Sequence, residues 1–325
     1  MTTPLIEFQH VDKVFNQQTA VSDLNLTINQ GELFVLVGAS GSGKTTSLKM
    51  INRLEPMTSG QITINDQDIT TLPVRQLRLE IGYVLQQIAL FPTMTVAQNI
   101  AVIPEMKQMP KAQINKLTDE LLTEVGLDPA VYRDRKPSEL SGGEQQRIGI
   151  LRAVAAQPKL VLMDEPFSAL DPISRQQLQD LVLRLHHRFN NTIVFVTHDM
   201  TEALKLGDRI GIMRQGQLLQ VDTPTAIAQH PVNDFVKEFF GANRAKNVYD
   251  VYVGRIGLVL GYLDTTNVTA ELSQIPEIDG QATLRAAFEI LAKQNYLAVT
   301  KEGVLQGYLD RQKILDYLSR YTAES

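Results

Sequence analysis

The eight residues Gly38-Ala39-Ser40-Gly41-Ser42-Gly43-Lys44-Thr45 fit the phosphate-loop pattern G-x-x-x-x-G-K-[ST]. They follow the apolar run 33–37, which is typical of a strand buried on both faces, and they open a helix that contains Leu48 and Ile51. The glycines let backbone N–H groups curl around phosphate oxygens, and the helix N-terminus adds positive potential. The stretch therefore predicts a nucleotide phosphate site, in which Lys44 reaches the terminal phosphates and the Thr45 hydroxyl binds Mg²⁺.

The segments farther along the chain predict an α/β fold built around a parallel sheet. Residues 160–163 and 193–196 are apolar runs of the same kind, and a helix with one apolar face lies between them. Asp171-Pro172 starts that helix as an N-cap followed by proline at the first helical position. Strand, helix and strand in this order favour crossover helices on a parallel sheet.

Other segments of the first 241 residues depart from this alternation. Residues 5–28 and 61–69 have short β-like runs with turn signals, which predict an antiparallel β part beside the parallel core. Residues 95–157 are richer in helical pattern and predict an inserted helical subdomain.

An acidic pair lies at the end of the second apolar run. Asp164-Glu165 follows residues 160–163 directly, and ligands of open parallel sheets bind at the carboxyl ends of the strands. Two adjacent carboxylates there can divide the work: Asp164 would hold Mg²⁺ through water, and Glu165 would polarise the attacking water as general base. The alternative is a solvated acidic turn with no function, and the presence of a phosphate loop in the same chain argues against it.

The stretch Leu140-Ser141-Gly142-Gly143-Glu144-Gln145-Gln146-Arg147 begins another helix. Ser141 and Glu144 form an S-x-x-E capping box, so a plain helix N-cap explains the pattern by itself. The same geometry offers exposed N–H groups, two glycines and a serine hydroxyl to an anion. The two interpretations are compatible.

Together, residues 38–45, 140–147 and 160–165, in this order and spacing, resemble an ATP-binding-cassette ATPase over roughly residues 5–240. The resemblance implies that Gln86 senses Mg²⁺ and the permease, that His198 contacts the γ-phosphate, and that Asp171 belongs to the D-loop, 168–171. ATP contacts are implied for Phe15, Gly38, Ser40, Gly41, Ser42, Gly43, Lys44, Thr45, Thr46 and Gln86. Glu165 and His198 are the implied catalytic residues, and Mg²⁺ would be held through Thr45, Gln86 and Asp164.

The resemblance also implies a homodimer in which two copies pair head to tail around ATP. The phosphate loop of one copy and the signature residues of the other would clamp each nucleotide. The signature residues are Ser141, Gly142, Gly143 and Glu144. From the residues alone, Phe15 could instead be a core aromatic, and a lone histidine after a buried strand, such as His198, is more often structural.

Several segments narrow the resemblance to importer ATPases. Residues 81–96 look like the segment that docks on a permease, and 49–54, 147–153 and 196–202 resemble the ATPase of glycine betaine, carnitine and choline importers. Ala39 and Thr93 depart from the proline and histidine usual there. The resemblance implies an ATPase at the cytoplasmic face of the cell membrane, with a permease as direct partner and a substrate-binding protein as indirect partner. Methionine or polyamine import, or a soluble cassette ATPase without a permease, are the alternatives.

The C-terminal part contains an internal repeat. Gly261-Tyr262-Leu263-Asp264 recurs as Gly307-Tyr308-Leu309-Asp310, so residues 249–325 predict two related β units, the first shortened and without a leading helix. We place a linker at 242–248. The region resembles a small α+β CBS pair with a truncated first unit, which implies either regulation by ionic strength or an adenine nucleotide, or a role in packing alone.

Composition sets limits on the class of protein. The chain has 325 residues, no cysteine, and 31 Lys and Arg against 36 Asp and Glu, for a net charge of −5. This balance gives no support for a nucleic-acid partner, and the lack of cysteine excludes disulfides and thiolate metal sites. No apolar run approaches the roughly 20 residues of a membrane-spanning helix.

Overall fold

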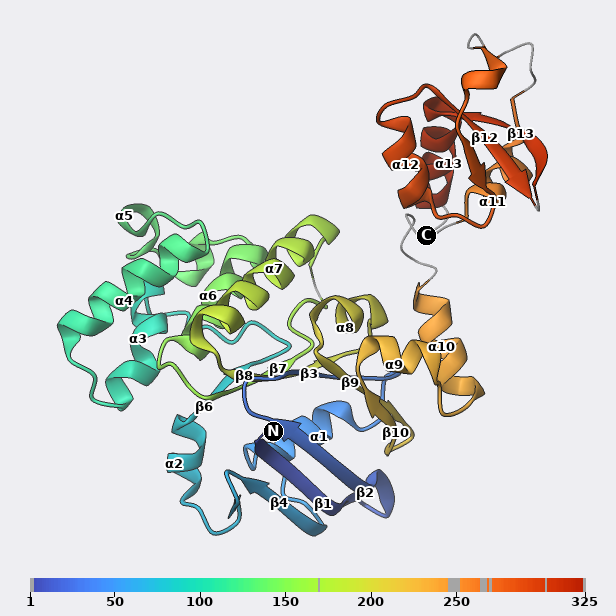
Figure 1. The fold of residues 1–325 in the computed structure, drawn as a ribbon. Coiled ribbons are helices and arrows are strands. Elements are labelled where there is room, and N and C mark those ends of the chain that lie inside the picture. Colours follow the sequence, from blue (N-terminus) through green and yellow to red (C-terminus); the bar gives the residue numbers. More distant parts are fainter. Residues whose placement is uncertain are drawn as a thin grey trace. The chain divides into compact units, whose positions relative to one another are not determined.

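The computed structural model describes residues 3–168, 170–244, 252–263, 268, 271–301 and 303–323. The chain divides into two compact units, Met1–Lys237 and Glu238–Ser325, which are described separately (Figure 1). Helix α10 (Asp234–Arg244) runs across this division, and residues 245–248 of the predicted linker lie outside the described residues.

The first unit is built on a six-stranded sheet with the order β10-β9-β3-β8-β7-β6. The strands are β3 (Leu33–Val37), β6 (Ile81–Val84), β7 (Leu160–Asp164), β8 (Thr192–Thr197), β9 (Arg209–Arg214) and β10 (Gln217–Asp222). All neighbouring pairs are parallel except β9 with β10. Because β3, β8, β7 and β6 are adjacent and parallel, the segments that follow them emerge at one edge of the sheet. The predicted parallel sheet is confirmed.

A second, antiparallel sheet has the order β2-β1-β4-β5. Its strands are β1 (Pro4–Phe15), β2 (Gln18–Asn29), β4 (Ser59–Ile64) and β5 (Gln67–Asp68), as expected from the β-like runs at 5–28 and 61–69. Helix α1 (Lys44–Ile51) lies between the two sheets (Figure 1). One apolar core joins them, since Leu48 and Ile51 of α1 pack with residues such as Ile6 of β1 and Val194 of β8.

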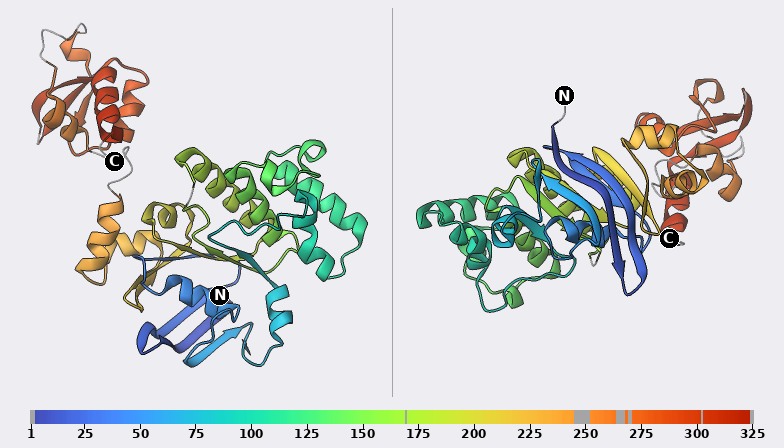
Figure 2. Two further views of the ribbon diagram at one scale, coloured as in Figure 1. Left: turned by 180° about the vertical axis from the view of Figure 1, so that it is seen from behind. Right: turned by 90° about the horizontal axis from the view of Figure 1, so that it is seen from below.

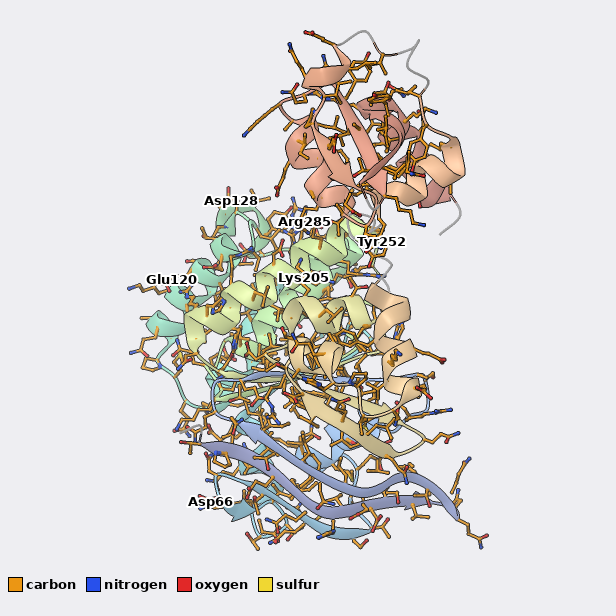
Figure 3. The ribbon with its side chains drawn as sticks, turned by 45° about the vertical axis from the view of Figure 1, so that its right-hand side comes forward. Asp66, Glu120, Asp128, Lys205, Tyr252 and Arg285 are labelled. Carbon is orange, nitrogen blue, oxygen red and sulfur yellow. The ribbon has the colours of Figure 1, made fainter. Side chains whose placement is uncertain are left out.

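Helices occupy much of the segment expected to be helical. They are α3 (Val96–Met106), α4 (Lys111–Glu124), α5 (Pro129–Tyr132) and α6 (Gly142–Val154). Figure 2 shows this group at the β6 end of the six-stranded sheet, with α9 (Pro224–Gln229) at the opposite, β10 end. Glu120 and Asp128 lie in the helical group, and Asp66 lies in the antiparallel part (Figure 3).

Two more helices cover the face of the parallel sheet opposite α1. Helix α7 (Pro172–Phe189) follows β7, and α8 (Met200–Leu206) follows β8. Lys205 of α8 binds Asp180 of α7 with 2.7 Å between Nζ and Oδ1. Helix α2 (Val74–Leu79) lies before β6. Among the described residues, no helix combines the length and apolar character that crossing a membrane would require.

The second unit has a three-stranded sheet of β11 (Glu277–Asp279), β12 (Tyr296–Lys301) and β13 (Val304–Asp310). Its helices are α11 (Val253–Leu260), α12 (Leu284–Leu291) and α13 (Arg311–Ala323). Residues from all three helices pack on one core with β12 and β13. Helices α12 and α13 lie before and after the strands β12 and β13 of the second repeat copy.

The prediction of a β unit in the first repeat copy is wrong for residues 253–260. Residues 253–260 form α11, because Val253, Ile256 and Leu260 lie on one helical face and pack into the apolar core. Gly257 is needed there, since a Cβ at that position would lie 2.0 Å from the Tyr262 ring. The two copies still meet: the Leu263 amide donates to the Tyr308 carbonyl at 2.8 Å. Residues 249–251 and 264–267 of the first copy lie outside the described residues.

Candidate active site

The phosphate loop joins β3 to α1 in a conformation that requires its glycines. Gly41 and Gly43 have φ of 76° and 102°, in the left-handed region. A Cβ at Gly43 would also lie 2.6 Å from the Ala20 carbonyl oxygen on β2, so the loop passes too close to that strand for a side chain. Ser42 Oγ is buried within the loop and has no hydrogen-bond partner among the described residues. The shape of this loop, called the cradle below, therefore depends on glycine at positions 41 and 43.

Lys44 lies at the base of this cradle and is buried. Its Nζ donates to the carbonyls of Gly38 and Ala39 at 2.7 and 2.9 Å. Burial lowers the pKa of Lys44, while the carboxylates of Glu165 and Asp164 act in the opposite direction. A cation held this way gains most from an anionic ligand, because a phosphate would replace neutral carbonyls as its partner.

A hollow of about 770 Å³ opens above the loop. Every residue predicted to contact ATP lines it except Gly38, and so do both predicted catalytic residues, Glu165 and His198. Gln86, which follows β6, lines the hollow, and its neighbour Gln87 does not. Residues that follow four adjacent strands thus converge on one cavity.

Asp164 ends β7 next to the phosphate loop. Its side chain is 3% exposed, so the alternative of a solvated acidic turn is wrong for this residue. Thr45 Oγ1 donates to Asp164 Oδ1 at 2.7 Å, and burial raises the pKa of Asp164. Hydroxyl and carboxylate oxygens this close are the donors that Mg²⁺ prefers, so the residues present fit that ion.

Glu165 is the first residue beyond β7 and has a left-handed backbone, with φ of 42°. Its amide donates to the Val196 carbonyl at 3.0 Å, which ties this turn to β8. Its carboxylate Oε2 lies 2.9 Å from Nδ1 of His198, which follows β8. The His198 side chain is 56% exposed, so it is not a buried structural histidine.

Phe15 ends β1 at the rim of the hollow. It is 40% exposed, and the Nζ of the buried Lys13 lies 4.3 Å from the centroid of its ring. Lys13 Nζ is itself held by the Pro56 carbonyl at 2.7 Å. The alternative of a core aromatic is therefore wrong, and the ring is available to a planar ligand.

The signature residues do not line this hollow. Ser141 caps α6 through the predicted capping box: its Oγ accepts from the Glu144 amide at 3.3 Å, and Glu144 Oε2 accepts from the Ser141 amide at 2.7 Å. Asp171 caps α7 by accepting from the amides of Ile173 and Ser174. A Cβ at Gly143 would lie 3.5 Å from Ser174 Oγ, so the two capped helix starts are neighbours.

Sequence reasoning missed three residues around these sites. Ala20 lines the hollow from β2, and Tyr132 donates from its hydroxyl to Glu144 Oε1 at 2.7 Å. Arg175 of α7 pairs with Asp199 and Glu202 beside His198. Nothing in the local pattern marks Ala20 or Tyr132, because each acts through a contact distant in sequence. For Arg175 a signal was available: it lies one turn after the predicted helix cap Asp171.

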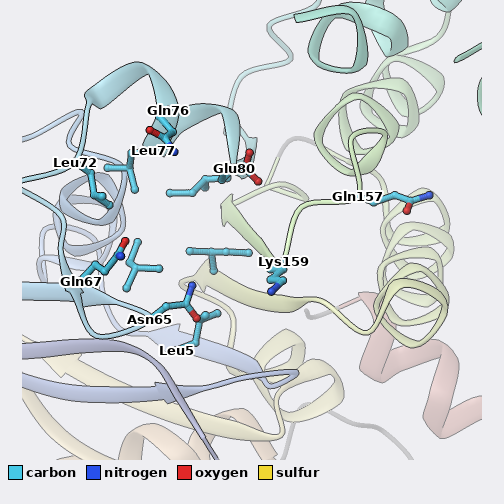
Figure 4. Close-up of a pocket in the computed structure, with 12 residues that line it drawn as sticks. Leu5, Asn65, Gln67, Leu72, Gln76, Leu77, Glu80, Gln157 and Lys159 are labelled. Carbon is cyan, nitrogen blue, oxygen red and sulfur yellow. The ribbon is translucent and has the colours of Figure 1, made fainter. Parts of the chain in front are cut away.

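A second hollow of about 370 Å³ lies at the opposite, amino ends of β6 and β7 (Figure 4). Ile81 and Leu160, which begin those strands, line it together with Leu77 of α2. None of the predicted site residues lines this hollow, so it is separate from the nucleotide site.

Comparison with known proteins places the chain in a family. The ABC transporter family matches residues 21–168. The dimeric, post-hydrolysis structure of the ATP-binding cassette MJ0796 bound to ADP and Pi has a TM-score of 0.61 and 31% identity, covering 67% of this chain and 98% of that one. With the relatives below, these matches show that the chain belongs to the ABC transporter family, as an ATP-binding cassette ATPase.

Within that family, several similar relatives are named for glycine betaine, carnitine or choline transport, and others for sulfate/thiosulfate or spermidine/putrescine import. The chain is 42% identical over 315 residues to the glycine betaine/carnitine/choline transport ATP-binding protein OpuCA of Bacillus subtilis (strain 168), covering 95% of this chain and 79% of the relative. It is 48% identical over 237 residues to the glycine betaine uptake system ATP-binding protein YehX of Escherichia coli (strain K12), covering 73% and 77%. The predicted cassette ATPase fold and the predicted family are confirmed.

Proposed function

We propose that the chain hydrolyses ATP to power import of a quaternary-ammonium osmoprotectant through a separate membrane permease. The observation that carries the ATPase part is the convergence of the phosphate loop, Glu165 and His198 on one hollow. The observation that supports the cargo is the similarity to the glycine betaine, carnitine and choline transport proteins, which with OpuCA extends over 95% of the chain.

In this proposal ATP binds through its phosphates and its base. The amides of residues 40–45 would surround the phosphates, and Lys44 would exchange its carbonyl partners for phosphate oxygens. Phe15, fixed from one side by Lys13, would stack on adenine with its exposed part.

Glu165 is the proposed general base. Water bound in the hollow would lose a proton to the Glu165 carboxylate, and His198, within hydrogen-bond distance of that carboxylate, would orient it and contact the γ-phosphate. Mg²⁺ neutralises charge that develops on phosphate oxygens during phosphoryl transfer. Thr45, Asp164 and Gln86 are the residues proposed to hold it, with Asp164 acting through water.

A second copy of the chain is the proposed partner at the nucleotide. Ser141 and its helix start do not line the hollow of their own chain, although their capped geometry suits an anion. A head-to-tail homodimer would bring Ser141, Gly142, Gly143 and Glu144 to the ATP of the other copy, with Asp171 nearby. The dimeric state of the solved cassette MJ0796 supports this arrangement.

The permease is proposed to contact the segment after β6, which places the chain peripherally at the cytoplasmic face of the membrane. Phe91 in that segment is 46% exposed, and the backbone beside it is fixed by Arg152, whose Nη1 donates to the Ala89 carbonyl at 2.6 Å. An exposed aromatic side chain on a backbone that is fixed by a hydrogen bond is suited to contact a partner protein such as the permease. A substrate-binding protein or domain would deliver the solute to the permease.

For the second unit we propose a CBS-like regulatory domain, in which the first repeat is incomplete. Its packed core of three helices and three strands supports a folded module. Binding of an adenine nucleotide by the full chain with Lys44→Ala, in which the phosphate loop is disabled, would support nucleotide sensing. No binding would favour ionic-strength sensing or packing.

The cargo is tested by competition in cells that import labelled glycine betaine through this system. Excess choline or carnitine should suppress uptake, and excess methionine or spermidine should not. Suppression by methionine or spermidine alone would replace the proposed cargo with an amino acid or a polyamine. The rival without a permease would be favoured if the chain fails to fractionate with membranes.

A further inference from the structure

Arg175 lies on α7, one turn after Asp171, and contacts three groups: one just before α7 and two at the start of α8. Its Nη2 donates to the Leu170 carbonyl at 3.3 Å, within the segment that leads into α7. Its Nη1 lies 3.7 Å from Asp199 Oδ2, and its Nε lies 3.9 Å from Glu202 Oε1. Nε is buried and forms no hydrogen bond with any residue that the structure describes. A single planar guanidinium thus joins segment 168–171 to the start of α8.

Hydrogen bonds near the start of α8 fix the residues on either side of His198, Thr197 and Asp199. Thr197 Oγ1 donates to Glu202 Oε2 at 2.6 Å and accepts from the Asp199 amide at 3.0 Å. Asp199 caps α8 by accepting from the Thr201 amide at 2.7 Å. His198 lies between Thr197 and Asp199, so the position of its backbone depends on both contacts.

The partner of Arg175 on α8 is a buried carboxylate. Glu202 is 5% exposed, and a carboxylate in that setting needs a nearby cation and hydrogen bonds. Arg175 supplies the cation, and Thr197 supplies the short hydrogen bond. The guanidinium therefore cannot move with segment 168–171 without disturbing the anchor of the His198 loop.

We propose that Arg175 is a positioning residue that couples segment 168–171 to His198. This inference rests on the proposed function, in which that segment faces the second copy of the chain and His198 assists hydrolysis. Closure against the second copy would move the Leu170 carbonyl, and Arg175 would carry that movement to Asp199 and Glu202. Through these contacts Arg175 would keep His198 beside Glu165, where Nδ1 lies 2.9 Å from Oε2, as the dimer closes.

The test is Arg175→Met, measured as steady-state ATP hydrolysis by the full chain. We expect kcat to fall about ten- to a hundredfold, the range expected for a displaced catalytic group, with KM for ATP within about twofold of wild type. ATP-dependent dimerisation, measured by light scattering with Glu165→Gln added, should be retained. Arg184→Met is the matched control, because Arg184 is on the same helix in a surface pair with Glu124; its kcat should stay within about twofold.

A second variant separates positioning from the cost of an unpaired buried charge. Arg175→Met combined with Glu202→Gln removes that charge and keeps an acceptor for Thr197. If Arg175 positions His198, the double variant stays slow; recovery of wild-type kcat would overturn the inference. The inference would also be overturned if Arg175→Met keeps a kcat within twofold of wild type, or if this substitution abolishes ATP-dependent dimerisation. Absence of hydrolysis by the wild-type chain would instead contradict the proposed function and this inference together.

Discussion

Nδ1 of His198 lies 2.9 Å from Oε2 of Glu165, across the gap between the ends of β8 and β7. Glu165 reaches this position from a left-handed backbone with φ of 42°, a conformation that costs free energy for any residue other than glycine. Such strain persists where the surroundings hold it, and here the Glu165 amide is bonded to Val196 of β8. The pair is consistent with a general base and the residue that orients it.

Replacing the proposed base should separate binding from chemistry. Glu165→Gln keeps the shape of the side chain but cannot accept a proton, so ATP hydrolysis should fall by about 10²- to 10⁴-fold. ATP affinity, measured by calorimetry, should stay within severalfold of wild type. Glu120→Gln, at an exposed position of α4, serves as the control and should hydrolyse ATP normally. Full turnover by Glu165→Gln would remove Glu165 from its role.

Replacing the buried lysine should act on binding itself. Lys44→Ala removes the cation at the base of the cradle, so the Kd for ATP should rise by about tenfold or more, as expected for a lost charge-assisted contact. Lys205→Ala removes an ammonium group paired with Asp180 on α7 and should leave the Kd unchanged. Equal affinity of wild type and Lys44→Ala would count against the phosphate-loop assignment.

Mixing two inactive variants tests whether the signature residues act on the other copy. In a head-to-tail dimer, one Lys44→Ala chain and one Ser141→Ala chain combine both defects in one site and leave the other site intact. An equal mixture should therefore recover up to about a quarter of wild-type hydrolysis, since half of the dimers are mixed and each has one sound site. If Ser141 acts on its own chain's nucleotide, mixing should recover nothing.

Stability of the apo chain should depend on pH through Glu202. The pKa of Glu202 is raised, mainly by burial and further by the nearby Asp199 carboxylate. The Thr197 hydrogen bond and the charges of Arg175 and His198 lower this pKa but do not cancel the rise. A raised folded-state pKa contributes stability that is full below the unfolded-state pKa and is lost as pH rises through the folded-state value. Glu202→Gln has no proton to lose, so it should melt above wild type at pH 7.5. Scanning calorimetry should show the gap closing toward pH 4.5; a constant gap would contradict this origin.

The parallel core and most of the site could be predicted from sequence because their signals are local. The run before Gly38 and the acidic pair after residues 160–163 each combine a buried strand with the motif that follows it. The capping boxes and N-caps at Ser141 and Asp171 likewise involve neighbours within three residues. Parallel pairing then brings the ends of those strands to one edge.

The remaining features depend on contacts that no local pattern records. Helix α11 occupies residues that align by offset with the end of β12 and the start of β13. The fit of Val253 and Ile256 into a core decides the conformation there. Gly257 matches Gly303 in sequence, yet it serves the approach of Tyr262 rather than a turn. Arg175 reaches Glu202 across 27 positions of sequence, a distance at which a single sequence carries no pairing signal.

The most direct test of the central claim is uptake of labelled glycine betaine by cells that lack this gene. The wild-type chain should restore uptake, more strongly at high salt, and Glu165→Gln produced at the same level should not. That result would establish both the power-supplying role and the class of cargo. Uptake restored equally by wild type and Glu165→Gln, or restored by neither, would contradict the account.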